Sequence, residues 1–368
     1  MRLISTRSLE PGMILASAVY NQVGQVLLQE KVELKISLIK RLIELDIKYV
    51  YIEDSLSAGI KVKDTIPASV KHKAIQTVEA AFTDMQAENK SKRSFLLDQN
   101  SKIFKDIIKG LLDEIKGNRD LLTILTDVYI YDSYIFQHSF NVTLYTLAVA
   151  MEMGYSSKSL ETIGLGAILH DVGKMMVPED ILMKPGKLTG DEFEVVKKHT
   201  DFGFDILRQL HTVPLLVAHC AFQHHERLDG SGYPRGLNGK EMHEYAKIIA
   251  VADVFDAVTS NRVYRGALLP HEGLEVLYAG SGTLFEPEIV DAFRRSVTIY
   301  PNGITVLLND SRKGIVSKQN PSLTERPVIR IIEENGRELQ EPYEIDLKIE
   351  LDVMIHSCDV DWKSPVAK

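Results

Sequence analysis

Two adjacent histidines, His224 and His225, are followed at once by the glycine-rich segment ERLDGSGYP. Imidazole is a frequent ligand of divalent transition metals, and glycine lets a backbone turn tightly and approach a site closely. Neighbouring side chains near a helix end point in different directions, so we expect the two histidines to reach different ions. The segment therefore indicates a metal centre bordered by a tight loop.

A second candidate group stands in the segment ETIGLGAILHDVGK, residues 161–174, where an apolar helix is expected to end at His170 and Asp171. Lys174 follows His170 by four residues and would share its helical face if the helix continued. A His-Asp pair alone occurs by chance. Its position at the end of an almost unbroken apolar helix makes this pair a candidate for chemistry.

The helix expected over residues 245–260 is nearly all apolar apart from Asp253 and Asp256. Burying an ionised carboxylate without a cation or hydrogen-bond partner is costly. Asp253 is therefore a metal or catalytic candidate, with a helix cap or a buried hydrogen bond as the alternative. Asp256 is expected to support a neighbouring group.

Nine of the eleven histidines fall between residues 138 and 271. Each could be an ordinary core or surface histidine, but five of them join two carboxylates on five expected helices, and helical bundles build metal sites from such inward groups. The seven candidates are His138, His170, Asp171, His199, His224, His225 and Asp253. Seven ligands are more than one tetrahedral ion needs, and they suit two ions. Sites with two adjacent ions catalyse displacement reactions at phosphorus. Nitrogen and oxygen donors without thiolate favour iron or manganese.

The order and spacing of these motifs resemble the HD-GYP family, a branch of the HD superfamily of metal-dependent phosphohydrolases. The resemblance covers residues 128–298, just under half of the chain, and is carried by the HD pair in HDVGK, the paired histidines, the GYP tripeptide and the later Asp253. It implies an all-helical domain that hydrolyses cyclic dinucleotides, mostly cyclic di-GMP.

The resemblance also implies roles for individual residues. All seven candidates would ligate metal, with Asp171 bridging two ions, and Lys174 would meet a phosphate oxygen. Arg262 and Arg265 match positions that grip phosphate, with a solvated helix face as the alternative. The residues expected to shape or contact the site from the loop are Gly232, Tyr233 and Pro234. The alternative is that this loop merely braces Glu226 and Arg227 against the fold. Members with three metals carry Glu four residues before the first histidine; Tyr134 stands there, so two ions are expected.

The implied reaction is hydrolysis of a 3′–5′ phosphodiester by a metal-bridging hydroxide that attacks phosphorus. The products would be linear pGpG and, after a second cut, GMP. A noncatalytic cyclic-dinucleotide receptor is the alternative of another class, and another HD-type nucleotide phosphohydrolase is the alternative among enzymes. The complete set of seven ligands favours an enzyme, but the sequence does not distinguish cyclic di-GMP from cyclic GMP-AMP.

The fold class expected is mainly α: a helical HD-type bundle flanked by two smaller regions. Residues 1–60 predict a small α+β module with a hairpin around residues 21–24, and residues 61–127 a helical connector. The HD-GYP domain would span residues 128–298. Residues 299–368 predict a β-rich region whose strands include 344–353, with a hairpin turn at Asn335-Gly336.

Composition sets further limits. The 368 residues are 45% hydrophobic and 26% charged, which is ordinary for a globular protein, and the net charge of −8 argues against nonspecific binding to DNA or RNA. Two cysteines, Cys220 and Cys358, predict no disulfide framework. No apolar run predicts a membrane span, so a cytoplasmic protein is expected. The helices over residues 67–116 are candidates for a homodimer contact, and the flanking regions for signalling partners.

Overall fold

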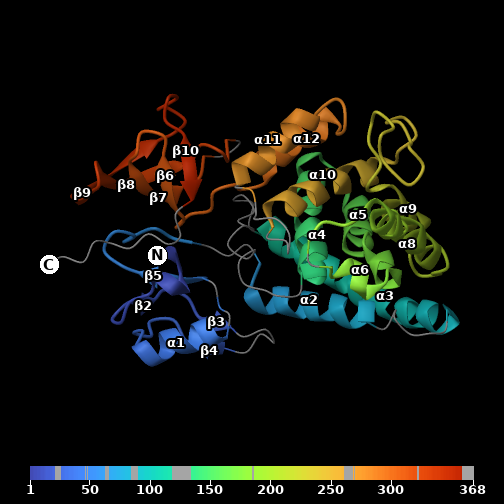
Figure 1. Ribbon diagram of the computed structural model, residues 1–368, viewed down its shortest axis with the longest axis horizontal. Helices are drawn as coiled ribbons and strands as arrows, with labels where there is room; N and C mark the ends of the chain where they lie inside the picture. The colour runs from blue at the N-terminus through green and yellow to red at the C-terminus, as the bar shows by residue number, and fades with distance from the viewer. Residues whose placement is uncertain are drawn as a thin grey trace. The chain divides into compact units, whose positions relative to one another are not determined.

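The computed structural model describes residues 1–20, 26–45, 47, 49–62, 66–83, 90–117, 134–184, 186–260, 268, 270–320 and 323–358 (Figure 1). It divides into two compact units. The first holds the described residues of 1–69 and 297–368, and the second those of 70–119 and 133–296. The mainly helical fold class, with small sheets near both ends of the chain, is confirmed.

The N-terminal part of the first unit is a small α+β module. Strands β1 (Arg2–Ser5), β5 (Tyr49–Glu53) and β2 (Ile14–Leu15) form an antiparallel sheet, and β3 (Val19–Tyr20) pairs with β4 (Val26–Leu28). Helix α1 (Ile36–Glu44) buries Leu42 in the same apolar cluster as Ile4 and Ile52. The turn expected at residues 21–24 lies outside the described residues.

The C-terminal part of this unit is a five-stranded antiparallel sheet. Its order is β10 (Ile355–Cys358), β6 (Thr305–Leu308), β7 (Lys313–Lys318), β8 (Val328–Glu334), β9 (Arg337–Asp346). The turn between β8 and β9 has positive φ at Asn335 and Gly336, as its sequence predicts.

One predicted strand in this region is right only at its start. Residues 344–346 end strand β9, but residues 347–349 and 351–352 form turns instead of continuing the strand predicted over 344–353, and the last strand, β10, begins only at Ile355. The Arg326 guanidinium donates to the backbone carbonyls of Leu347, Glu350, Leu351 and Val353, which fixes the turn. The alternating apolar pattern gave no sign of this distant arginine.

The two parts of the first unit pack on each other although about 250 residues separate them. The backbone N–H of Leu3 donates to Gly303, and Leu56 and Ile60 share a buried cluster with Ile315 and Ile332. The sequence predicted these regions separately, because neither carries a motif that points to the other.

The second unit is a bundle of helices. Helices α2 (Ala68–Thr83) and α3 (Lys90–Gly117) precede α4 (Tyr134–Glu152), α5 (Ser157–Leu169), a 3-10 helix η4 (Val172–Met176), α6 (Glu179–Leu182), α7 (Gly190–Lys197), α8 (His199–Leu207), α9 (Leu215–Gln223), α10 (Glu244–Thr259), α11 (Pro270–Gly280) and α12 (Pro287–Ser296). Helices α4, α5, α9 and α10 pack around one another, and α8 lies beside α9 (Figure 1). These helices carry the predicted ligands.

The helices predicted as a connector belong to this bundle. The apolar face of α3 buries Phe104, Ile108 and Leu111, and Ile108 lies against α5 at Gly164. This face is therefore covered within the chain, and a homodimer contact through it stays a prediction. Within the described residues, no helix is long and apolar enough to cross a membrane.

Candidate metal centre

Asp171 lies at the middle of the centre, fully buried where α5 ends. Its Oδ2 is 3.5 Å from His138 Nε2 and 3.4 Å from His170 Nε2. Its Oδ1 is 3.4 Å from His199 Nε2 and 3.7 Å from His224 Nε2. Each oxygen of this one carboxylate thus faces its own pair of imidazole rings.

These contacts define two groups of ligand atoms, each within 4.8 Å of one another. The first group is His138, His170 and Asp171, and the second is Asp171, His199, His224 and His225. Asp253 on α10 contacts both, with Oδ1 3.1 Å from His138 Nε2 and Oδ2 3.6 Å from His225 Nδ1. All seven predicted ligands therefore converge, although they come from residues 138 to 253.

Four of the five imidazoles are oriented by a hydrogen bond at Nδ1. His170, His199 and His224 donate to the carbonyls three residues earlier, and the distances from Nδ1 to oxygen are 2.7, 2.7 and 2.9 Å. Because a carbonyl only accepts, Nδ1 carries a proton, and in the neutral ring Nε2 keeps its lone pair. A histidine held in this way presents Nε2 as a metal ligand.

The fourth ring, His138, is held by a carboxylate. Its Nδ1 lies 2.7 Å from Asp256 Oδ2, while Asn141 Nδ2 donates to Asp256 Oδ1 at 2.9 Å. Asp256 is 1% exposed, so this pairing is shielded from water. The supporting role predicted for Asp256 has this geometric basis.

Burial keeps most of these rings neutral. It lowers the pKa of His199 to about 4, and burial together with the neighbouring imidazoles lowers the pKa of His224 and His225 well below the usual value. For Asp171, burial alone would raise the pKa, but the charge of Lys174, the largest opposing cause, holds it well below its usual range. Neutral imidazole and ionised carboxylate are the protonation states that bind metal.

His138 differs, because two carboxylates outweigh the burial that would lower its pKa. Hydrogen bonds to Asp253 and Asp256 raise the pKa of His138 to about 9. A proton on this ring and a divalent cation are therefore alternative sources of the positive charge that the buried carboxylates require.

The donor set fits divalent cations. His199 Nε2 and His224 Nε2 lie 3.3 Å apart, and since both rings donate from Nδ1, two lone pairs face each other. His170 Nε2 and Asp171 Oδ1 are buried and have no hydrogen-bond partner among the described residues. Lone pairs that converge in a buried site are stabilised by a bound cation.

The apolar helix ends where the sequence indicated, beside His170 and Asp171, and does not continue to Lys174. Helix α5 ends at Leu169, and residues 172–176 form the tighter helix η4. Lys174 therefore returns to Asp171 itself, with Nζ 2.5 Å from Oδ2. Gly173 permits this path, because a Cβ there would lie 1.9 Å from the carbonyl oxygen of His199.

The GYP loop is held against the end of α9. A Cβ on Gly232 would lie 2.4 Å from Glu226 Cα, so close approach requires glycine there, whereas Gly230 supplies a positive φ of 79°. Buried Glu226 accepts hydrogen bonds from the backbone N–H groups of Arg235 and Leu237 at 2.8 and 2.9 Å. The alternative left open from the sequence, a loop braced against Glu226, is therefore present in the structure beside any role at the site.

The paired histidines lie side by side, and the expectation that they reach different ions stays a prediction. His224 and His225 fall in the same group around Asp171, with ring centroids 4.1 Å apart. His224 caps α9 in a helical conformation, so the chain has not yet turned away when His225 follows. His225 nevertheless also approaches Asp253.

Three side chains named from the sequence are not covered by the structure. Arg262 and Arg265 fall outside the described residues, as does the side chain of Tyr134.

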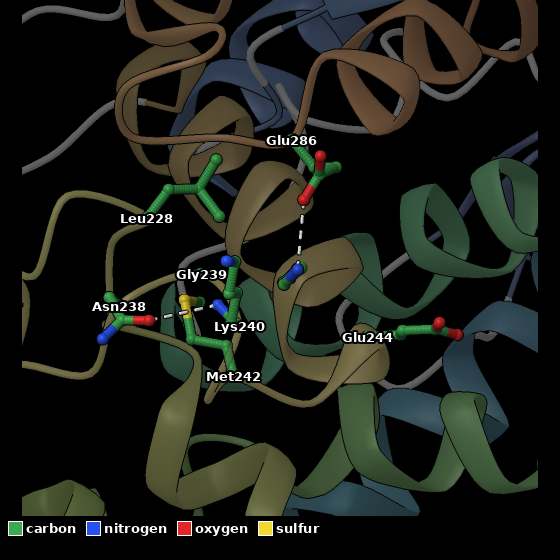
Figure 2. Close-up of a pocket in the computed structure, with 8 residues that line it drawn as sticks. Leu228, Asn238, Gly239, Lys240, Met242, Glu244 and Glu286 are labelled. Carbon is green, nitrogen blue, oxygen red and sulfur yellow. Dashed lines mark hydrogen bonds and ion pairs between the residues drawn. The ribbon is translucent and has the colours of Figure 1, made fainter.

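The pocket in Figure 2 lies apart from the predicted ligands, since none of them lines it. It is lined by Leu228, Asn238, Gly239, Lys240, Met242, Glu244, Lys247 and Glu286. Among the remaining histidines, His219 packs on Phe204 and His243 caps α10, which are structural roles.

Comparison with known proteins agrees with this geometry. A family model described as an HD domain matches residues 127–289, and one described as a KOW domain associated with HD domain matches residues 305–362. A cyclic di-GMP phosphodiesterase of Pseudomonas aeruginosa is 30% identical over 312 residues, which cover 80% of this chain and 75% of the relative. A cyclic di-GMP phosphodiesterase of Thermotoga maritima is 36% identical over 225 residues, covering 61% of this chain and 60% of that relative.

A third relative has another named substrate. A 3′3′-cGAMP-specific phosphodiesterase of Vibrio cholerae is 37% identical over 176 residues, which cover 48% of this chain and 38% of the relative. The matched HD domain and the His-Asp centre together define the class, an HD-domain protein whose clusters could hold divalent metal. Within that class, the chain belongs to the HD-GYP family.

Proposed function

We propose that this chain is a metal-dependent phosphodiesterase that hydrolyses cyclic di-GMP to linear pGpG, with GMP as the product of a second cut. The observation that carries the proposal is the placement of Asp171. One of its oxygens faces His138 and His170, and the other faces His199 and His224. The names of the relatives from Pseudomonas aeruginosa and Thermotoga maritima support the choice of substrate.

The seven predicted ligands would hold two divalent ions, with Asp171 shared between them. Such ions, when bound, lower the pKa of a coordinated water and stabilise negative charge that develops on phosphoryl oxygens. Iron and manganese suit the nitrogen and oxygen donors, and buried Cys220 is not part of either group. The number and identity of the ions belong to the proposal.

The chain's own cations would act on the substrate. Lys174 is 17% exposed beside Asp171, so its ammonium can meet a phosphate oxygen from the solvent side and stabilise charge in the transition state. Arg262 and Arg265 are proposed to grip a second phosphate. Three neutral imidazoles, His199, His224 and His225, would remain ligands through neutral pH.

A direct test incubates the manganese- or iron-loaded full chain with cyclic di-GMP and, in parallel, with cyclic GMP-AMP. Chromatography should identify pGpG from the first substrate. The cGAMP-specific relative makes cyclic GMP-AMP the second candidate, and faster turnover of it would reassign the substrate. Tight binding without turnover at either metal loading would contradict the enzyme and establish a receptor.

A further inference from the structure

Among the described ligands of the candidate metal centre and Lys174 beside them, solvent exposure is concentrated on two residues. The side chains of His138, His170, His199 and His224 are at most 1% exposed. His225 and Lys174, by contrast, are each 17% exposed. His225 and Lys174 are therefore the residues of the centre that a substrate phosphate can reach from solvent.

An aromatic and cationic group stands beside His225. The Tyr233 ring stacks on His225, with centroids 4.6 Å apart and an angle of 29°. Phe193 on α7 meets Tyr233 edge to face, with centroids 6.2 Å apart. Lys197 Nζ lies 5.5 Å from the Phe193 centroid and 5.7 Å from that of Tyr233, and it also pairs with Glu194.

Phe193 stays 46% exposed although it is a large apolar side chain. Its helix is fixed at its start by a capping box between Thr189 and Glu192, and the Glu192 carboxylate also pairs with Lys184. A single exposed apolar residue needs no explanation. An exposed ring held on an anchored helix, next to a second ring and a cation, is the arrangement that binds nucleobases.

We propose that Phe193, Tyr233 and Lys197 form a stacking platform for a purine base of the cyclic dinucleotide. The inference rests on the proposed function and adds the surface that binds the base. Phe193 offers the exposed ring face, because one face of Tyr233 already covers His225. Lys197 adds positive charge next to the phosphodiester that follows the base. The platform thereby positions the neighbouring phosphate at His225 and Lys174.

The test compares wild type with Phe193→Ala and Phe193→Trp in the manganese-loaded full chain, using a cyclic dinucleotide that contains 2-aminopurine. Stacking quenches the fluorescence of this base. Wild type and Phe193→Trp should quench it on binding, while Phe193→Ala should lose most of the quench and raise KM about 5- to 10-fold with kcat within about twofold. Tyr278→Ala, which removes a similarly exposed ring on α11, is the matched control and should behave as wild type.

The outcomes separate the two proposals. Equal quench and equal KM in wild type and Phe193→Ala would overturn the platform, as would a wild-type complex that shows no quench. Wild-type quench without hydrolysis would contradict the phosphodiesterase and leave the platform standing, because the fluorescence reports stacking independently of turnover.

Discussion

His138 shows how a single buried contact can orient a candidate ligand. Its ring is fixed by Asp256, which is itself fixed by Asn141, so Nε2 points at Asp171 and Asp253. Carboxylates behind metal-binding histidines fix ring orientation and raise basicity, and their loss costs about 10- to 100-fold in metal affinity.

Asp256→Asn should therefore weaken metal binding by about 10- to 100-fold while changing the fold little, since the side chains have nearly the same shape. An amide NH2 at this position would face a donor, either His138 Nδ1 or Asn141 Nδ2. Competition with a fluorescent chelator measures the affinity. Asp205→Asn, at an exposed position on α8, is the control and should match wild type. Unchanged affinity in Asp256→Asn would show that His138 needs no support.

At the scale of elements, most of the centre could be predicted from the sequence. Apolar periodicity predicts the helices that hold or end beside His138, His170, His199, His224 and Asp253, and the motifs indicate these residues as candidate ligands. The path after His170 could not be predicted, because a tight 3-10 helix and an α-helix share the same local pattern. The choice depends on packing between Gly173 and His199, which are distant in sequence.

The contact between Gly173 and His199 predicts that alanine has opposite effects on stability at two glycine positions. Gly173→Ala would force a Cβ into the His199 carbonyl, so η4 should move away from α8, with a cost of about 1–3 kcal/mol or more and a loss of metal affinity. Gly110→Ala is the control, because a Cβ there meets nothing within 4 Å and the residue lies inside α3. It should stabilise the protein by about 0.5–1 kcal/mol. Denaturant unfolding measures both, and equal effects would refute the packing argument.

At the scale of the whole molecule, the packing of the N-terminal module on the C-terminal sheet was beyond sequence reasoning. Leu56, Ile60, Ile315 and Ile332 meet in one cluster, yet no periodicity links them. The turn fixed by Arg326 was missed for the same reason. Local patterns predict elements, whereas contacts between distant elements depend on complementary shape.

The buried neutral histidines predict how stability depends on pH in the presence of chelator. The pKa of His199 is lowered to about 4, so between pH 6.5 and 4 the unfolded chain binds the extra proton and stability falls as pH falls. The neutral His199 ring alone should lower the free energy of unfolding by about 2 kcal/mol at pH 5. The pKa of His138 is raised to about 9, so its contribution to the free energy of unfolding is fully present below pH 6.5. It therefore does not offset the loss from His199 in that range. Urea unfolding at pH 6.5 and 5 checks the prediction, and equal stability would contradict it.

The most direct test of the two-ion centre is elemental analysis of anaerobically purified protein, paired with product identification, for wild type and Asp171→Ala. Wild type should hold two ions per chain and convert cyclic di-GMP to pGpG, whereas the variant should lose both metal and turnover. Asp205→Ala should match wild type. An Asp171→Ala protein that still hydrolyses cyclic di-GMP with two ions bound would contradict the central role of this carboxylate.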